Sequence, residues 1–280
     1  MGYVFTLEEF EKGRIPDAQG YRTAEVLIRN GLKNLFGRGL IYGANIHGSS
    51  LHSDGGIGSD IDVLVISYGA EEGLRLLNNQ IRQNTFVPVE FVTVPISLAE
   101  SGLHNLDYLY SNYIQKHCAG GIISRDPFLV VKPSPGWRNI SQGVLQKLAS
   151  QLFKFSKERS RLPHDFGPQH CDLLEKILRQ PIYSAIDLLR IVRKGEFPNE
   201  GARTLSKREC CELYSKEFPQ GPTCELNRVL ELREEYRRSL QIPRIGQTHY
   251  RDLLQKIDDS YPLAKSVIER NFDILLKRKA

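Results

Sequence analysis

Residues 41–66, IYGANIHGSSLHSDGGIGSDIDVLVI, decide the fold of this chain, because two apolar runs enclose a polar, glycine-rich connector. The second run carries Asp60 and Asp62, and residues two positions apart on a strand point to the same face. Ile61 and Val63 then point to the opposite face, toward a core. Buried carboxylates are costly unless a cation meets them, and Mg²⁺ prefers carboxylate and phosphate oxygens. The stretch therefore predicts a divalent-metal site at the beginning of a buried strand.

The segments around this stretch predict alternating helices and strands, judged from the spacing of their apolar residues. Glu90 is the only acid of the third predicted strand, and Val89 and Phe91 share the face opposite to it. Glu90 therefore either lines the same site as the two aspartates or faces water on an edge strand. In chain order we expect a helix at 20–36, strands at 40–46 and 60–66, a helix at 71–83, a strand at 88–94 and a helix at 97–117.

The second half of the sequence predicts helices, and we expect no strand after residue 140. Residues 118–140 combine Gly, Pro and a short apolar run, which is typical of a connection between domains. Ser206 and Glu209 have the form of a capping box, so a helix is expected to start near residue 206. The helical candidates are 141–157, 170–194, 205–217, 223–240, 248–258 and 262–278. We therefore predict an α+β domain at 1–125, with a short mixed sheet and flanking helices, followed by an all-α helical bundle at 126–280.

Charge and cysteine content limit the cellular setting and the partners. Residues 1–140 hold 12 Lys/Arg and 14 Asp/Glu, whereas residues 141–280 hold 26 and 19, so the second half carries a formal +7. This charge favours an anionic partner or reflects solvated helix surfaces. Five cysteines without a Cys-x-x-Cys pair argue for a reducing compartment. With no signal peptide or membrane span recognised in the sequence, we expect a cytoplasmic protein.

Four features occur in one order: Gly48-Ser49, ten intervening residues, Asp60-x-Asp62 in an apolar strand, and Glu90 on a later strand. This ordered set resembles the nucleotidyltransferase superfamily, which has the DNA polymerase beta-like fold. The resemblance covers about residues 20–100. The helical remainder is similar in architecture to the C-terminal bundles of small-molecule members such as the aminoglycoside nucleotidyltransferases. Fold alone does not determine function.

The resemblance implies a role for each motif residue. Asp60 and Asp62 would be catalytic residues that hold Mg²⁺, as two ions, against the triphosphate of ATP or another nucleoside triphosphate. Glu90 would either complete the metal shell or accept the proton of the attacking hydroxyl. Gly48 and Ser49 would cradle the β- and γ-phosphates. Ser59 either helps the nucleotide site by orienting the carboxylate of Asp60 or is an ordinary loop serine.

The expected reaction is transfer of a nucleoside monophosphate, AMP from ATP, to the hydroxyl of a small molecule, with release of pyrophosphate. Transfer to RNA, such as a tRNA 3′ end, or to protein is one alternative, and a non-catalytic nucleotide-binding module is another. A basic second half suits polycationic aminoglycosides poorly, and RNA better. Yet the aromatic residues expected of a single-strand platform mostly fall at core-like helical positions: Phe153, Phe155, Tyr183, Tyr214, Tyr236 and Tyr250. The acceptor and the oligomeric state stay open.

Overall fold

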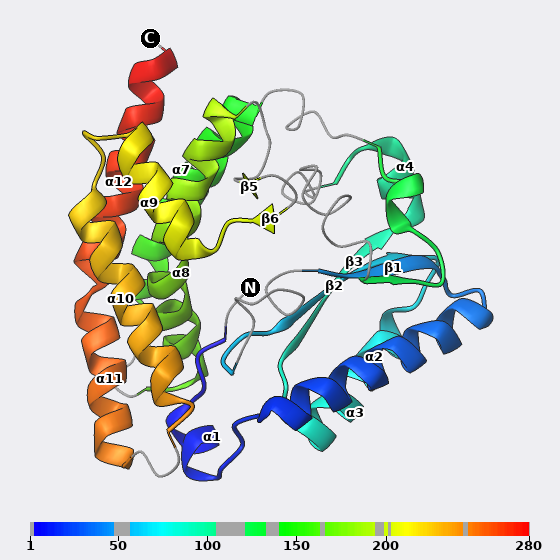
Figure 1. The fold of residues 1–280 in the computed structure, drawn as a ribbon. Helices are drawn as coiled ribbons and strands as arrows, with labels where there is room; N and C mark the ends of the chain where they lie inside the picture. Colours follow the sequence, from blue (N-terminus) through cyan, green and yellow to red (C-terminus); the bar gives the residue numbers. More distant parts are fainter. Residues whose placement is uncertain are drawn as a thin grey trace. The chain divides into compact units, whose positions relative to one another are not determined.

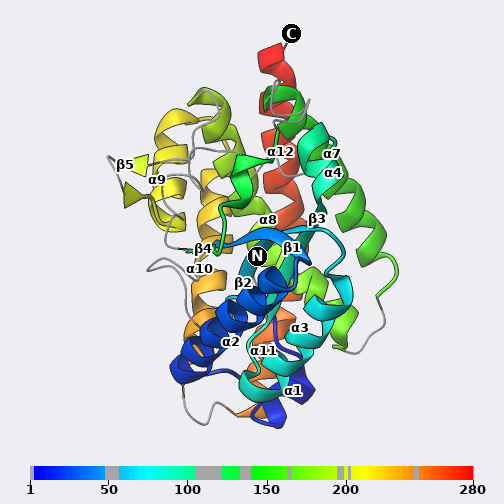
Figure 2. The same ribbon diagram turned by 90° about the vertical axis from the view of Figure 1, so that its right-hand side faces the viewer.

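The computed structural model describes residues 3–47, 57–104, 121–132, 140–162, 166–193, 199–200, 203–242 and 246–279. The chain forms two compact units, drawn in Figures 1 and 2. The sheet unit is Arg14–Arg138, and the helical unit is Gly2–Gly13 together with Asn139–Ala280. The fold is α+β, as predicted. The predicted domain boundary between residues 125 and 126 stays a prediction.

The sheet unit is built on a small mixed sheet with the strand order β3-β2-β1-β4. The first strand, β1, pairs antiparallel with β2 on one side and with β4 on the other, while β2 pairs parallel with β3. The described strands of this sheet are β1 (Ile41–His47), β2 (Ile61–Ser67), β3 (Val89–Pro95) and β4 (Ile122–Ile123). The sheet is therefore short and mixed, as the sequence predicts.

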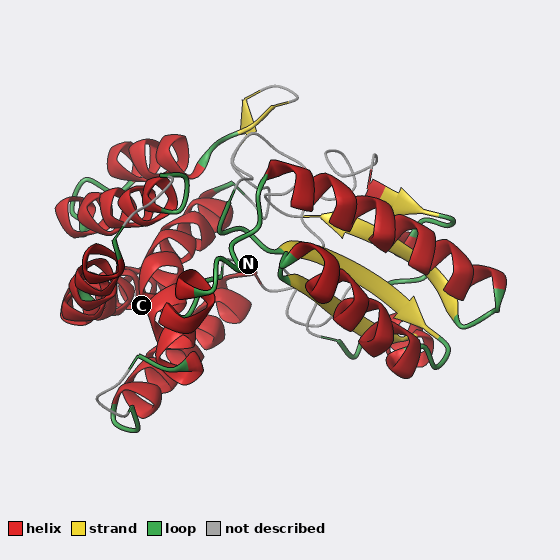
Figure 3. Ribbon diagram, turned by 90° about the horizontal axis from the view of Figure 1, so that it is seen from below, coloured by secondary structure: helices red, strands yellow, loops and turns green. Residues whose placement is uncertain are grey.

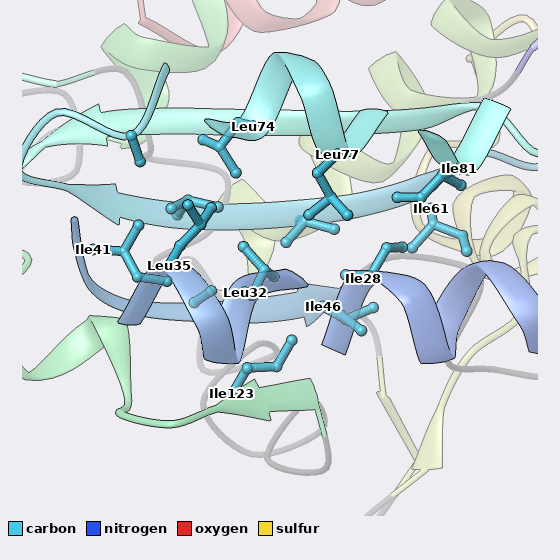
Figure 4. Packing of buried hydrophobic residues seen from close by; sticks show 14 of the residues in the cluster. Ile28, Leu32, Leu35, Ile41, Ile46, Ile61, Leu74, Leu77, Ile81 and Ile123 are labelled. Carbon is cyan, nitrogen blue, oxygen red and sulfur yellow. The ribbon is translucent and has the colours of Figure 1, made fainter. Parts of the chain in front are cut away.

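Two helices, α2 (Ala18–Gly37) and α3 (Glu71–Thr85), cover one face of the sheet, as Figure 3 shows. They approach closely because a glycine of each helix faces a leucine of the other. A Cβ added at Gly31 would lie 2.5 Å from Leu77, and one added at Gly73 would lie 2.6 Å from Leu35. The buried residues between helices and sheet form one core cluster (Figure 4), in which β2 contributes Ile61, Val63 and Val65.

The opposite face of β2 is also buried, so the apolar residues of this strand alternate between two cores. Leu64 and Ile66 pack there with Val94 and Val131. The covering segments include α4 (Ile96–Ser101) and the short 3₁₀ helix η3 (Pro127–Leu129), from which Phe128 packs against this cluster. A strand buried on both faces explains why residues 61–66 read as a nearly continuous apolar run.

The region after β3 differs from the sequence-based prediction. The helix expected over 97–117 is wrong in extent, because α4 ends at Ser101 and Gly102 caps it in the left-handed conformation. Residues 105–120 lie outside the described residues. The segment 118–140 is not merely a connection, because it supplies β4, which lies against β1. At this edge a Cβ on Gly43 would lie 2.2 Å from the backbone oxygen of Arg125. A strand of two residues is too short to produce a recognisable period.

The helical unit is organised around α8 (Pro168–Val192), which packs against the other long helices. A capping box at Ser206 and Glu209 starts α9, as predicted. Each of the six predicted helices has a counterpart among the described residues. Besides α8, these are α7 (Ile140–Arg159), α9 (Lys207–Glu217), α10 (Thr223–Ser239), α11 (Gln247–Asp259) and α12 (Tyr261–Lys279). The prediction that no strand follows residue 140 is wrong, because β5 (Asn199–Glu200) pairs antiparallel with β6 (Arg203–Thr204). Two residues per strand leave no alternation to detect.

The first residues of the chain belong to the helical unit rather than to the sheet. Phe5 is fully buried, its backbone N–H donates to the hydroxyl of Tyr236 at 3.0 Å, and the hydroxyl of Tyr250 donates to its carbonyl at 2.7 Å. A short helix, α1 (Leu7–Glu11), follows, and the ring of Phe10 stacks on that of Tyr250. Contacts across more than 200 residues of sequence thus anchor the N-terminal arm.

A buried polar network joins three helices of the same unit. The hydroxyl of Tyr214 on α9 donates to Asn271 Oδ1 on α12, and Asn271 Nδ2 donates to Ser184 Oγ on α8 at 2.7 Å. All three residues are fully buried, so these hydrogen bonds satisfy groups that water does not reach. Within the described residues, none of the helices combines the length and the apolar character that crossing a membrane requires.

Candidate metal centre

Parallel pairing of β2 and β3 brings the three predicted acids together. The register places Asp62 opposite Glu90 and Ile61 opposite Val89. Asp60 directly precedes β2. One carboxylate oxygen from each of Asp60, Asp62 and Glu90 lies within 4.8 Å of the others. Both aspartates are 6% exposed and Glu90 is half-buried, so three acids meet at a largely covered end of the sheet.

The alternation along the strands explains why these side chains share a face. Ile61 belongs to the core under α2 and α3, and Val89 and Phe91 pack against that same core. Asp62 and Glu90 therefore project to the other face of the sheet. Asp62 and Glu90 thus share the face that the alternation predicts, and that Glu90 lines one metal site with the aspartates stays a prediction.

The position of Asp60 depends on contacts outside the ladder. The hydroxyl of Tyr21, on α2, donates to the carbonyl of Ser59 at 2.6 Å. On the other side of Asp60, the N–H of Ile61 donates to the carbonyl of Pro88 at 2.9 Å. The peptide groups on both sides of Asp60 are thus hydrogen-bonded to segments distant in sequence. Sequence reasoning did not single out Tyr21, because nothing in a pattern links residues 38 positions apart.

His47 lies at the end of β1, in register with Asp62. Its side chain is buried, and burial lowers the pKa of His47 from 6.5 to about 4, although the charge of Asp60 acts in the opposite direction. The imidazole is therefore neutral at pH 7. The pairing of His47 with Asp62 depends on cross-strand register, which does not follow from spacing along the chain.

The predicted phosphate-binding residues Gly48 and Ser49 lie outside the described residues. Ser59 is described and buried, and its carbonyl accepts the Tyr21 hydrogen bond. The role predicted for its side chain, orientation of the Asp60 carboxylate, stays a prediction.

The donor set suits a hard divalent cation. All three groups offer carboxylate oxygens, which Mg²⁺ and Mn²⁺ prefer over the softer thiolate or imidazole ligands of other metals. Two oxygens bound to one Mg²⁺ at about 2.1 Å lie at most ~4.2 Å apart. Separations within 4.8 Å therefore need at most a small side-chain rotation to meet one ion. Burial of three like charges also favours a cation at this position.

The sequence matches no protein-family model and no curated protein sequence.

Proposed function

We propose that this protein is a metal-dependent nucleotidyltransferase of the DNA polymerase beta-like superfamily. In this proposal it moves AMP from ATP to a hydroxyl of a small molecule and releases pyrophosphate. The observation that carries the proposal is the meeting of carboxylate oxygens from Asp60, Asp62 and Glu90 within 4.8 Å on a mixed sheet. The proposal includes the order of domains in small-molecule members, a catalytic sheet domain followed by a helical bundle.

In this reaction a lone pair of the acceptor oxygen forms a bond to the α-phosphorus, and the bond from that phosphorus to the bridging oxygen breaks. The electron pair of the broken bond leaves with pyrophosphate. Asp60 and Asp62 hold Mg²⁺, which when bound neutralises charge on the phosphate oxygens. Glu90 either holds the metal with them or takes the acceptor proton on a carboxylate oxygen. Gly48 and Ser49 are proposed to receive the β- and γ-phosphates.

The proposal of a small-molecule acceptor takes into account that several basic side chains of the helical unit are engaged in ion pairs, although the formal +7 of residues 141–280 remains after every acid is counted. These ion pairs, some partly buried and some exposed, within or between helices, are Lys147–Asp187, Arg159–Asp258, Lys176–Glu158, Arg179–Glu175, Arg208–Glu234, Lys256–Glu235 and Arg270–Glu225. Basic side chains engaged in this way contribute less to a phosphate-binding surface.

The aromatic residues weighed as a stacking platform support the same choice. Phe155, Tyr214, Tyr236 and Tyr250 are buried, as their helical positions suggested. Phe153 is 67% exposed and is therefore an exception among them. Of the six residues weighed, all of them described, Phe153 is the exposed one and Tyr183 is half-buried, whereas single-strand binding uses successive exposed aromatic side chains.

The test is incubation of the protein with each of four α-³²P-labelled nucleoside triphosphates, Mg²⁺ and a cell extract separated into small molecules, RNA and protein. We expect label from ATP in the small-molecule fraction. Label confined to RNA or protein would contradict the small-molecule acceptor and would still support nucleotidyl transfer. Failure to label any fraction, together with absence of divalent-metal binding, would contradict the proposed function.

Matched variants connect the activity to the acids. Asp60→Asn and Asp62→Asn should each reduce transfer at least ~10³-fold, because each removes a charged ligand for the ion that stabilises the transition state. Glu72→Asn is the control, since Glu72 is an exposed acid of the same unit that pairs with Arg75 on the surface of α3. Glu90→Gln should retain nucleotide binding and slow turnover if Glu90 is the proton acceptor. Wild-type turnover in both aspartate variants would contradict the metal role.

A further inference from the structure

The three acids are not held in the same way. Asp62 and Glu90 lie opposite each other within the β2–β3 ladder, whose hydrogen bonds continue along both strands and set their separation. Asp60 lies one residue before β2. Its backbone direction is therefore decided by whatever holds the residues on either side of it.

Among the described residues, two hydrogen bonds contribute to that hold. Ile61 is tied to the carbonyl of Pro88, which comes from the segment entering β3. Ser59 is tied to the hydroxyl of Tyr21 at 2.6 Å, within the range of strong O–H···O hydrogen bonds. Tyr21 is itself secured, because it belongs to α2 and packs against the core beneath the sheet. A rigid side chain on a packed helix thus fixes the peptide group that precedes a metal-binding acid.

We infer that Tyr21 is a positioning residue for Asp60, which holds the Ser59–Asp60 peptide so that the Asp60 carboxylate meets those of Asp62 and Glu90. The inference rests on the proposed function in one respect, that the three acids bind a divalent ion. Without the Tyr21 hydroxyl, the Ser59 carbonyl rotates more freely and Asp60 spends less time in the binding geometry. Loss of groups that orient metal ligands typically lowers metal affinity 10–100-fold.

The experiment measures Mn²⁺ affinity without nucleotide, by electron paramagnetic resonance of free Mn²⁺, in wild-type protein and in Tyr21→Phe. Tyr214→Phe is the matched control, because it also removes one hydroxyl that donates a hydrogen bond, in this case to Asn271 in the helical unit. We expect Kd to rise at least ~10-fold in Tyr21→Phe and to stay unchanged in Tyr214→Phe. Equal Kd values for wild type and Tyr21→Phe would overturn the inference.

Two further measurements distinguish a positioning role of Tyr21 from a general loss of structure: the free energy of unfolding, and Mn²⁺ binding in a protein that already carries Asp60→Asn. In EDTA, Tyr21→Phe should lose no more than ~1.5 kcal/mol of unfolding free energy, the usual cost of one hydrogen bond. In Asp60→Asn protein, which keeps Asp62 and Glu90, adding Tyr21→Phe should weaken Mn²⁺ binding no further. A further tenfold loss there would show that Tyr21 does not act through Asp60. Absence of Mn²⁺ binding in wild-type protein would instead refute the metal site proposed above.

Discussion

Phe5 allows a quantitative test of how the N-terminal arm contributes to the helical unit. Its side chain is fully buried, and its ring meets that of Tyr3 edge-on at 4.9 Å between centroids. Phe5→Ala keeps the backbone N–H and carbonyl that bond to Tyr236 and Tyr250, so the substitution isolates side-chain packing. Buried Phe→Ala changes cost about 3–5 kcal/mol through lost apolar burial and the cavity that remains. Because a terminal arm relaxes into part of this cavity, we expect a loss of ~3 kcal/mol.

Hydrogen exchange read peptide by peptide is the appropriate assay, because it reports the opening free energy of each segment. A loss of ~3 kcal/mol corresponds to about 100-fold faster exchange of the slowest amides, and we expect this acceleration in α8, α10 and α11. Urea unfolding in EDTA gives the global free energy of unfolding for comparison. Phe153→Ala is the control, because this phenylalanine is 67% exposed and its truncation should change stability by no more than ~0.5 kcal/mol.

The reasoning is refuted if Phe5→Ala costs less than ~1 kcal/mol, the typical effect of any point substitution. It is also refuted if faster exchange is confined to β1, β2 and β3 while the helices remain protected. Either outcome would mean that the arm does not stabilise the helices on which Phe5 lies.

Three further predictions concern both units. Gly43→Ala should lower the free energy of unfolding in urea by roughly 1–3 kcal/mol, because the added methyl would overlap the backbone oxygen of Arg125. Gly37→Ala is the control, since the space around its Cβ is open, and it should be neutral or slightly stabilising. The pKa of His47 is about 4 when folded and 6.5 otherwise, so only the unfolded chain gains this proton as pH falls from about 6.5 to 4. Stability should then fall by ~3 kcal/mol over this range, and His47→Gln should remove that contribution; an unchanged pH dependence in the variant would contradict it. Burial raises the pKa of the Cys171 thiol to about 12, so iodoacetamide should modify exposed Cys224 first and reach Cys171 only on unfolding, as located by peptide mass spectrometry.

The local elements of the fold were predictable where apolar spacing is long and regular. The helices after residue 140 repeat their apolar positions over several turns, and Ser206 with Glu209 marks the start of α9 by local hydrogen bonding alone. Short elements escaped prediction for the opposite reason. The ladder at β5 and β6 and the edge strand β4 each involve two residues per strand, and such lengths carry no period.

The candidate site divides in the same way. Alternation on two predicted strands was enough to predict that Asp60 and Asp62 share one face of the sheet and that Glu90 and Val89 lie on opposite faces. Side-chain direction on a strand is a local property. Whether the two strands pair parallel, and in a register that sets Glu90 opposite Asp62, depends on long-range hydrogen bonding. Spacing along the chain does not contain that information.

The sequence by itself therefore determined the long elements, the acids and the face on which those acids lie, since these follow from periodicity and residue chemistry over a few neighbours. Only the tertiary structure decided that Tyr21 holds the peptide before Asp60 and that Phe5 packs among helices more than 150 residues away. Such contacts join positions whose closeness arises from packing of the whole unit, and no local pattern of residues encodes that packing.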